Sequence, residues 1–326
     1  MEITSRLKTS RPMGASRRWT AGLAVAALMF SLGACSGDEP EAAVETETVV
    51  PTPPPSPSPE PTPEPTETET ATEEPEPEEV GTPLEGGPVL AVKIDQVDAA
   101  YPRTGLASAD VIYVDQVEYG LTRLMAVFSS TLPERVGPVR SARPNDPTIL
   151  ANYGPVALAF AGASGATFTH YLDVGTQINV SHDGGGFHRD NSRAAPHNLY
   201  GTPSVLLERA DGSQPPGDVG FRYGDPAPGG TPATAVSTRY PATRMSAAYQ
   251  ADSGTYEVST NGRVEIDTLT GEPVTPTTIV IQKLVMENSL NGAGTGNATP
   301  LAGLVGSGEA IVLRDGQVWN GAWERA

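Results

Sequence analysis

ASADVIYVDQVEYGLTRLMAVFSS, residues 107–130, is the most informative stretch of this 326-residue chain. It contains two runs rich in β-branched and aromatic residues, VIYVDQVE (111–118) and LTRLMAVFS (121–129), separated by Tyr119-Gly120. Such runs on either side of a short turn that contains Gly are typical of a β-hairpin. Because apolar residues occupy both faces of each run, we expect the hairpin to belong to a sheet that is covered on both sides.

Further strands lie on both sides of this hairpin. PVLAVKI (88–94) is a short apolar run that ends at Asp95, and residues 156–160 form another. The segments between the strands have the length of short helices. Strands that alternate with helices predict an α/β (α+β) domain with a mixed sheet over residues 88–210.

One helix start is marked by its residue types. Asp146 is a suitable N-cap, and Pro147 suits the first helical position. A short helix over residues 147–153 can end at Gly154, because Gly commonly follows the last helical residue. We therefore expect a helix directly before the strand at 156–160.

The last third of the chain has a different character. Residues 211–235 are rich in Gly and Pro and predict a linker, whereas residues 236–326 predict a smaller β-rich domain. Asn261-Gly262 and Asp315-Gly316 have the residue types of two-residue hairpin turns. The expected strands are 248–260, 263–267, 277–284, 309–313 and 317–319.

Residues 1–35 have the order of an export signal. Basic residues, including Arg17-Arg18, precede an apolar run at 21–32 that is too short to span a bilayer as a helix. Leu32-Gly33-Ala34-Cys35 resembles the lipobox of bacterial lipoproteins, and Cys35 is the only Cys. We expect a lipid anchor at Cys35 and an extracytoplasmic protein on the outer face of the cytoplasmic membrane. The alternatives are an ordinary secretory signal and, on the basis of Arg17-Arg18, twin-arginine export.

Most of the chain's formal charge of -18 lies in residues 36–87, which contain fifteen acids and neither Lys nor Arg. This Pro-, Glu- and Thr-rich segment cannot bury enough apolar surface to fold, so we expect a disordered tether. The alternative is that the acidic run binds cations or basic proteins. The acidic composition argues against a nucleic-acid partner, and a single Cys excludes an internal disulfide framework.

Polar residues at the expected strand ends are the first candidate site. Asp95 ends the first strand, and with Tyr119-Gly120 as a two-residue turn, Glu118 would pair with Leu121 and Gln116 with Arg123. Ligands often bind off the ends of strands in open α/β sheets. The alternative for Glu118 and Arg123 is a structural salt bridge.

Two further clusters follow. GPVRSARP (137–144) places Arg140 and Arg143 on a Pro-bounded loop, a pattern suited to binding phosphate or carboxylate; the alternative is exposed Arg paired with surface acids. The second cluster runs from His182 to Tyr200. Its spacing matches no zinc motif, so we expect a polar loop that lines a pocket. Its candidate binding residues are Arg189, His197, Asn198 and Tyr200.

Four blocks together resemble the YerB-like family of bacterial lipoproteins, which is built on a domain of unknown function. These blocks are AVKID (91–95), residues 107–130, GPVRSARP (137–144) and RDNSRAAPHNLYGTP (189–203). The resemblance covers about residues 86–326. It implies an α/β N-terminal domain, a smaller β-rich C-terminal domain, export and a lipid anchor, but no activity.

This chain departs from the family pattern at three places. Gln96 stands where relatives tend to have Asn, and residues 160–164 lack a His that relatives tend to have. Relatives also continue after the final Trp, whereas this chain ends at residue 326, which predicts a truncated second domain with an unpaired strand edge.

The sequence therefore predicts an exported envelope protein that binds an anionic ligand, a cell-wall polymer or another envelope protein, through an Arg-rich pocket, with no cofactor. One alternative is a metal-assisted phosphotransfer enzyme that acts on polyprenyl-phosphate-linked wall polymers. In that case acids such as Asp95 and Glu118 would hold Mg²⁺. The other alternative is a purely structural tethered module. Whether the protein is an enzyme stays open at this point.

Overall fold

The computed structural model describes residues 86–221, 224–289 and 298–326. The expected signal peptide, the lipidation site Cys35 and the tether up to residue 85 lie outside the described residues. Among the described residues, no helix is long and apolar enough to cross a membrane.

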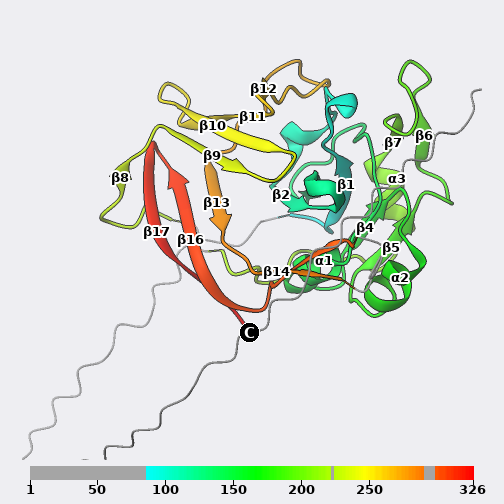
Figure 1. The fold of residues 1–326 in the computed structure, drawn as a ribbon. Coiled ribbons are helices and arrows are strands. Elements are labelled where there is room, and N and C mark those ends of the chain that lie inside the picture. Colours follow the sequence, from blue (N-terminus) through cyan, green and yellow to red (C-terminus); the bar gives the residue numbers. More distant parts are fainter. Residues whose placement is uncertain (1–85, 222–223, 290–297) are drawn as a thin grey trace, which may run out of the picture. The chain divides into compact units, whose positions relative to one another are not determined.

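The N-terminal part is built on a five-stranded mixed sheet, drawn in cyan to green in Figure 1. The strand order is β2-β3-β1-β4-β5. Neighbouring strands are antiparallel from β2 to β1, and β1, β4 and β5 are parallel. The strands are β1 (Leu90–Asp95), β2 (Val111–Gln116), β3 (Thr122–Phe128), β4 (Ala157–Phe160) and β5 (Ile178–Ser181).

Short helices cover both faces of this sheet, which confirms the predicted class. α3 (Pro203–Arg209) packs Leu206 against one face, together with Leu90 and Val92 of β1. α1 (Asn145–Leu150) packs Leu150 against the other face. α2 (Gly165–Thr167), which continues into a π-helical turn at Phe168–Leu172, covers that second face as well. Successive side chains of β1 point to opposite faces of the sheet, and both faces are covered. All six residues of the strand are therefore buried, which explains why its sequence is mostly apolar.

The predicted start of the first helix was wrong by two residues. α1 begins at Asn145 after Pro144, so Asp146 lies inside its first turn rather than at its N-cap. The Asp146 carboxylate instead accepts the backbone N–H of Arg143 at 2.7 Å and pairs with Lys93. A single turn of 3₁₀-helix follows, and the predicted end at Gly154 is confirmed, since this glycine has a φ of 90°.

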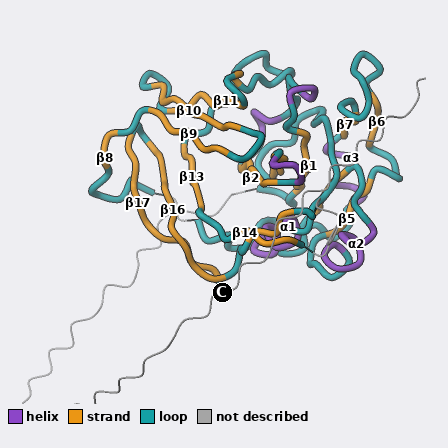
Figure 2. Tube along the Cα trace, in the orientation of Figure 1, coloured by secondary structure: helices purple, strands orange, loops and turns teal. Residues whose placement is uncertain are grey.

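The C-terminal part is built mainly of strands joined by loops, drawn in orange and teal in Figure 2. One sheet has the order β12-β11-β10-β9 and the other β13-β16-β17-β8. Tyr256 and Leu313, both buried, pack in the core between them. The strands of the first sheet are β9 (Ala235–Arg239), β10 (Arg244–Gln250), β11 (Thr255–Thr260) and β12 (Arg263–Val264). Those of the second are β8 (Thr231–Pro232), β13 (Thr278–Gln282), β16 (Gly306–Arg314) and β17 (Gln317–Arg325).

Both predicted hairpin turns are confirmed, at Asn261-Gly262 and at Asp315-Gly316, and all four residues have positive φ. The predicted strand 248–260 is instead the end of β10, a turn and β11. The predicted linker 211–235 contains β8 and the first residue of β9.

Two ribbons complete the fold: β6 (Phe187–Arg189) with β7 (Leu199–Gly201), and β14 (Met286–Asn288) with β15 (Pro300–Ala302).

Candidate functional site

Three charged residues form a row across neighbouring strands. Asp95 at the end of β1 pairs with Arg123 in β3, and Arg123 pairs with Asp115 in β2. Directly paired residues point to the same face of a sheet, so these side chains share the face that α1 covers. A cluster of buried charge therefore occupies one end of an otherwise apolar face.

The predicted register of this hairpin was wrong by one residue. Gln116 pairs with Thr122, not with Arg123. The connection has three central residues, Glu118–Gly120, because Tyr119 and Gly120 both adopt left-handed backbone conformations, with φ of 60° and 69°. Since a slip of one residue moves a side chain to the other face, Gln116 does not share a face with Arg123.

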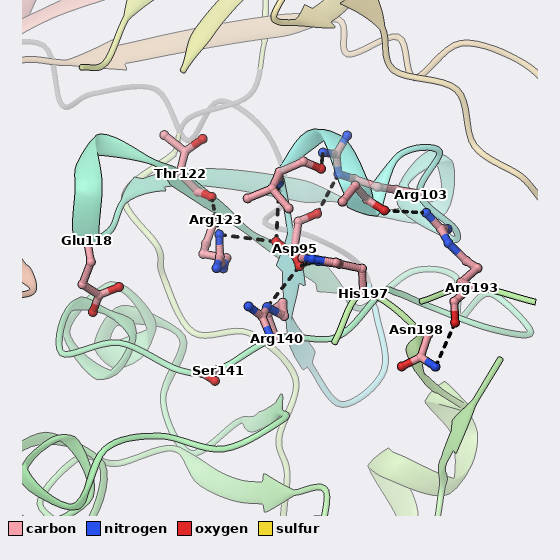
Figure 3. Close-up of polar contacts among 12 residues, drawn as sticks. Asp95, Arg103, Glu118, Thr122, Arg123, Arg140, Ser141, Arg193, His197 and Asn198 are labelled. Carbon is pink, nitrogen blue, oxygen red and sulfur yellow. Dashed lines mark hydrogen bonds and ion pairs between the residues drawn. The ribbon is translucent and has the colours of Figure 1, made fainter. Parts of the chain in front are cut away.

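Asp95 is fully buried and surrounded by cationic side chains (Figure 3). Its Oδ1 lies 3.3 Å from Nη1 of Arg123, and its Oδ2 lies 3.0 Å from Nε of Arg140. The same Oδ2 contacts Nδ1 of His197 at 2.7 Å. We call these four residues the Asp95 cluster. It contains two guanidinium groups and an imidazole for one carboxylate.

Backbone hydrogen bonds hold Arg140 in place. Residues 136–142, here called the Arg140 segment, lie beside the second half of β1, where β4 no longer pairs with it. The Arg140 N–H donates to the carbonyl of Lys93 at 2.8 Å, and the Asp95 N–H donates to the carbonyl of Pro138 at 2.9 Å. The N–H of Val139 donates to the carbonyl of Leu199 at 2.6 Å, which also ties the His197 region to this segment.

Glu118 and Arg143 form a second ion pair close to the first cluster. Nε and Nη2 of Arg143 both contact Oε2 of Glu118, at 2.9 and 2.7 Å. The hydroxyl of Thr299 donates to Oε1. Burial raises the pKa of Glu118, but the charge of Arg143 and the Thr299 hydrogen bond lower it more, so this pKa lies below its ordinary value.

A third group of charges lies under α1. Nζ of Lys93 pairs with Oδ1 of Asp146 at 2.8 Å, and both side chains are fully buried. Asn145 donates to Oδ1 of Asp115 at 2.9 Å and accepts the N–H of Ala302. Burial raises the pKa of Asp115 to about 6, although Lys93 opposes the shift.

The remaining predicted residues do not contact Asp95. Arg189 donates to Oδ1 of Asn198 at 2.8 Å, and Asn198 is buried. Tyr200 is buried beneath the guanidinium of Arg135, and its hydroxyl accepts from Arg193 at 2.7 Å. These contacts lie within and around the β6–β7 ribbon and the loop between its strands, which contains His197.

Sequence reasoning missed Lys93, Asp115, Asn145 and Asp146 as members of this charged region. One signal was present: Lys93 interrupts an apolar strand, and a buried Lys requires a partner. Its partner could not be read from the sequence, because Asp146 lies 53 positions further on. Among the described residues, no group of three or more His, Cys, Asp or Glu side chains could hold a metal ion.

Two family models match this chain. The N-terminal domain of the family described as "Protein of unknown function (DUF3048)" matches residues 72–216, and its C-terminal domain matches residues 236–326. The two domains occur in order and cover most of the sequence. The chain belongs to the DUF3048 family. The YerB-like resemblance seen in the sequence is thereby confirmed.

Two comparisons with individual proteins agree with this assignment. The chain is 30% identical over 123 residues to the "Putative lipoprotein YerB" of Bacillus subtilis, an alignment that spans 37% of each chain. The crystal structure of the YerB protein from Bacillus subtilis superimposes with a TM-score of 0.61 at 23% identity. That superposition covers 74% of this chain and 82% of the other, so the two chains share a fold.

Proposed function

We propose that this DUF3048 protein is an exported, lipid-anchored protein that binds an anionic ligand of the cell envelope at the Asp95 cluster. The signal-like residues 1–35 and the similarity to a protein named as a lipoprotein support export and anchoring at Cys35. The geometry around Asp95 supports anion binding.

The observation that carries the proposal is the unused donor capacity of the cluster. Arg140 contacts Asp95 through Nε, and the two Nη groups at the end of its guanidinium are further donors. Among the residues that the structure describes, neither Nη group donates a hydrogen bond. Likewise Nε2 of His197 is on the ring edge opposite to the contact with Asp95. The two side chains are 24% and 22% exposed, so a ligand can reach these donors.

The charge balance favours an anion. Two permanently charged guanidinium groups face the one carboxylate of Asp95, and that of Arg140 is the more exposed of the two. Asp95 is buried behind them and orients both. Guanidinium forks that are fixed in this way suit phosphate or carboxylate groups.

The metal-assisted alternative is less well supported by these contacts. It needs Asp95 and Glu118 as ligands of a divalent cation. Both oxygens of Asp95 contact cationic side chains, and Glu118 is held by Arg143 and Thr299. A metal ion would have to displace these groups against the repulsion of nearby arginines.

The proposal is tested by the melting of the purified chain with a poly(glycerol phosphate) polymer, inorganic phosphate and a carboxylated wall peptide in separate arms. A ligand at about 100 times its Kd should stabilise the fold by about 2.7 kcal/mol. The stabilisation should be lost in Arg140→Ala and kept in Arg314→Ala, which removes an exposed arginine from the C-terminal part. Stabilisation that survives Arg140→Ala would move the site elsewhere, and no stabilisation in any arm would favour a structural tethered module.

A further inference from the structure

His197 and Asp95 form a pair with the geometry of a proton-transfer site. Nδ1 of His197 lies 2.7 Å from Oδ2 of Asp95, and the aspartate is fully buried. A carboxylate can only accept, so Nδ1 donates and the lone pair of the neutral ring is on Nε2. A histidine oriented by a buried acid in this way can remove a proton from a nucleophile.

The contrast with a second His–Asp pair in the chain shows what is particular about this one. Nδ1 of His182 lies 3.7 Å from Oδ1 of Asp183, and the two side chains are 40% and 82% exposed. Solvent competes for both partners there. The described contacts of His182 and Asp183 include no arginine or lysine side chain. His197 alone of the two combines a buried acid with adjacent guanidinium groups.

Those guanidinium groups would lie beside the reacting atom. Nε of Arg140 and Nδ1 of His197 both contact the same oxygen of Asp95, so the two side chains are neighbours. For these two residues to act together, a ligand oxygen bound by the Nη groups of Arg140 has to lie within reach of Nε2 of His197. Fixed positive charge at this point stabilises negative charge that develops on a transferring group.

We infer that the Asp95 cluster hydrolyses phosphodiesters, with His197 as the proton acceptor and Arg140 as the group that binds the phosphate oxygens. The inference rests on the proposed anion site. A phosphodiester carries one negative charge, which matches the excess of one guanidinium over Asp95 while the imidazole is neutral. The two non-bridging oxygens of the phosphodiester suit the two Nη groups of Arg140.

The step balances with water as the only co-reactant. A water molecule attacks phosphorus, and Nε2 of His197 takes its proton as the new P–O bond forms. The P–O bond to the leaving alcohol breaks, and the leaving oxygen receives the proton from Nε2. The products are a phosphomonoester and an alcohol, and the enzyme returns to its starting state.

The test uses the purified chain with bis(4-nitrophenyl) phosphate, with 4-nitrophenyl phosphate and 4-nitrophenyl acetate as comparison substrates, each with and without EDTA. We expect release of 4-nitrophenolate from the diester in preference to the other two. His197→Ala should lower kcat by about 100-fold or more, and added imidazole should restore part of the loss. His182→Ala is the matched control and should leave the rate unchanged.

Binding of inorganic phosphate is measured on the same samples by the shift in melting temperature. Phosphate binding without turnover of the diester would overturn the hydrolase inference and leave the proposed anion site intact. Absence of both would remove the proposed function as well. Turnover that EDTA abolishes would also overturn the inference, and so would turnover that His197→Ala leaves unchanged. If imidazole does not rescue His197→Ala, His197 has a structural role and is not the proton acceptor.

Discussion

The guanidinium of Arg103 and the carboxylate of Glu265 form a buried ion pair, although 162 positions separate them in the sequence. Their side chains are 1% and 4% exposed. Nε of Arg103 also donates to the backbone carbonyl of Asp95 at 2.7 Å. The pair thus links the C-terminal part of the chain directly to the residue at the centre of the candidate site.

Removing one partner of this pair should be strongly destabilising. In Glu265→Ala the charge of Arg103 stays buried without its acid, which costs about 3–5 kcal/mol in comparable cases. We expect the free energy of unfolding, measured by urea denaturation, to fall by that amount. Glu309→Ala, which breaks the exposed pair with Lys283, should change it by less than about 1 kcal/mol. Equal losses in the two variants would contradict the importance of burial here.

The stability of the protein should depend on pH through Asp115. Its pKa is raised from 3.8 to about 6, so the folded state binds this proton more tightly than the unfolded state does. The resulting stabilisation is complete below pH 3.8 and is lost as pH rises through about 6, with a total of about 3 kcal/mol. In Asp115→Asn this loss should be absent.

The measurement is urea denaturation of both proteins between pH 4 and pH 8. The free energy of unfolding of Asp115→Asn relative to the parent should increase across this range. Asp211→Asn, a change at an exposed acid, is the control and should follow the parent. A constant difference between Asp115→Asn and the parent would show that Asp115 does not titrate in this range.

Glu118 should produce the opposite dependence at lower pH. Although burial raises its pKa, the neighbouring Arg143 and Thr299 bring it below 4.5, so its contribution to stability is present above that pH and is lost as pH falls. We expect Arg143→Ala to reduce the loss of stability between pH 5 and pH 3. Thr299→Ala should reduce it less, because only one uncharged hydrogen bond is removed. The urea midpoint as a function of pH distinguishes the two variants, and an unchanged acid dependence in Arg143→Ala would refute this role.

Gly137 should not tolerate a larger residue. A Cβ atom at this position would lie 2.8 Å from Cδ1 of Tyr200 and 2.9 Å from the carbonyl oxygen of Leu199. Gly162 is a matched control, because its φ of 147° is close to the 152° of Gly137 and no atom lies within 4 Å of its Cβ position. Gly137→Ala should therefore cost about 1–3 kcal/mol more than Gly162→Ala in thermal or urea unfolding. The prediction fails if the two variants are equally stable.

The sequence was sufficient for the fold class, because the apolar strands and the Gly-containing turns are local signals. The register of the hairpin could not be read from such local signals. It depends on the left-handed conformation of Tyr119, a residue type that gives no warning of positive φ. One residue of slip was enough to place Gln116 rather than Asp115 beside Arg123.

For the candidate site as well, the sequence predicted the residue types but not the contacts between them. Asp95, Arg123, Arg140 and His197 could each be chosen from the sequence as polar residues in unusual positions, and the structure brings them together. Their mutual contacts could not be foreseen, because these contacts join β1, β3 and two separate loops. Arg189, Asn198 and Tyr200 were chosen on the same grounds, yet the β6–β7 ribbon directs them to one another and to Arg135 and Arg193 instead.

The Arg140 segment looks like a surface loop in the sequence, but its backbone is hydrogen-bonded at almost every position. Val136 exchanges two hydrogen bonds with Gly201, Gly137 exchanges two with Thr104, and Arg140 bonds to both Lys93 and Ala161. Amide protons in such a segment exchange with deuterium only when the surrounding structure opens. The backbone of Arg140, the residue that we assign to ligand binding, is therefore rigid. Little binding free energy would be lost in ordering this segment when a ligand binds.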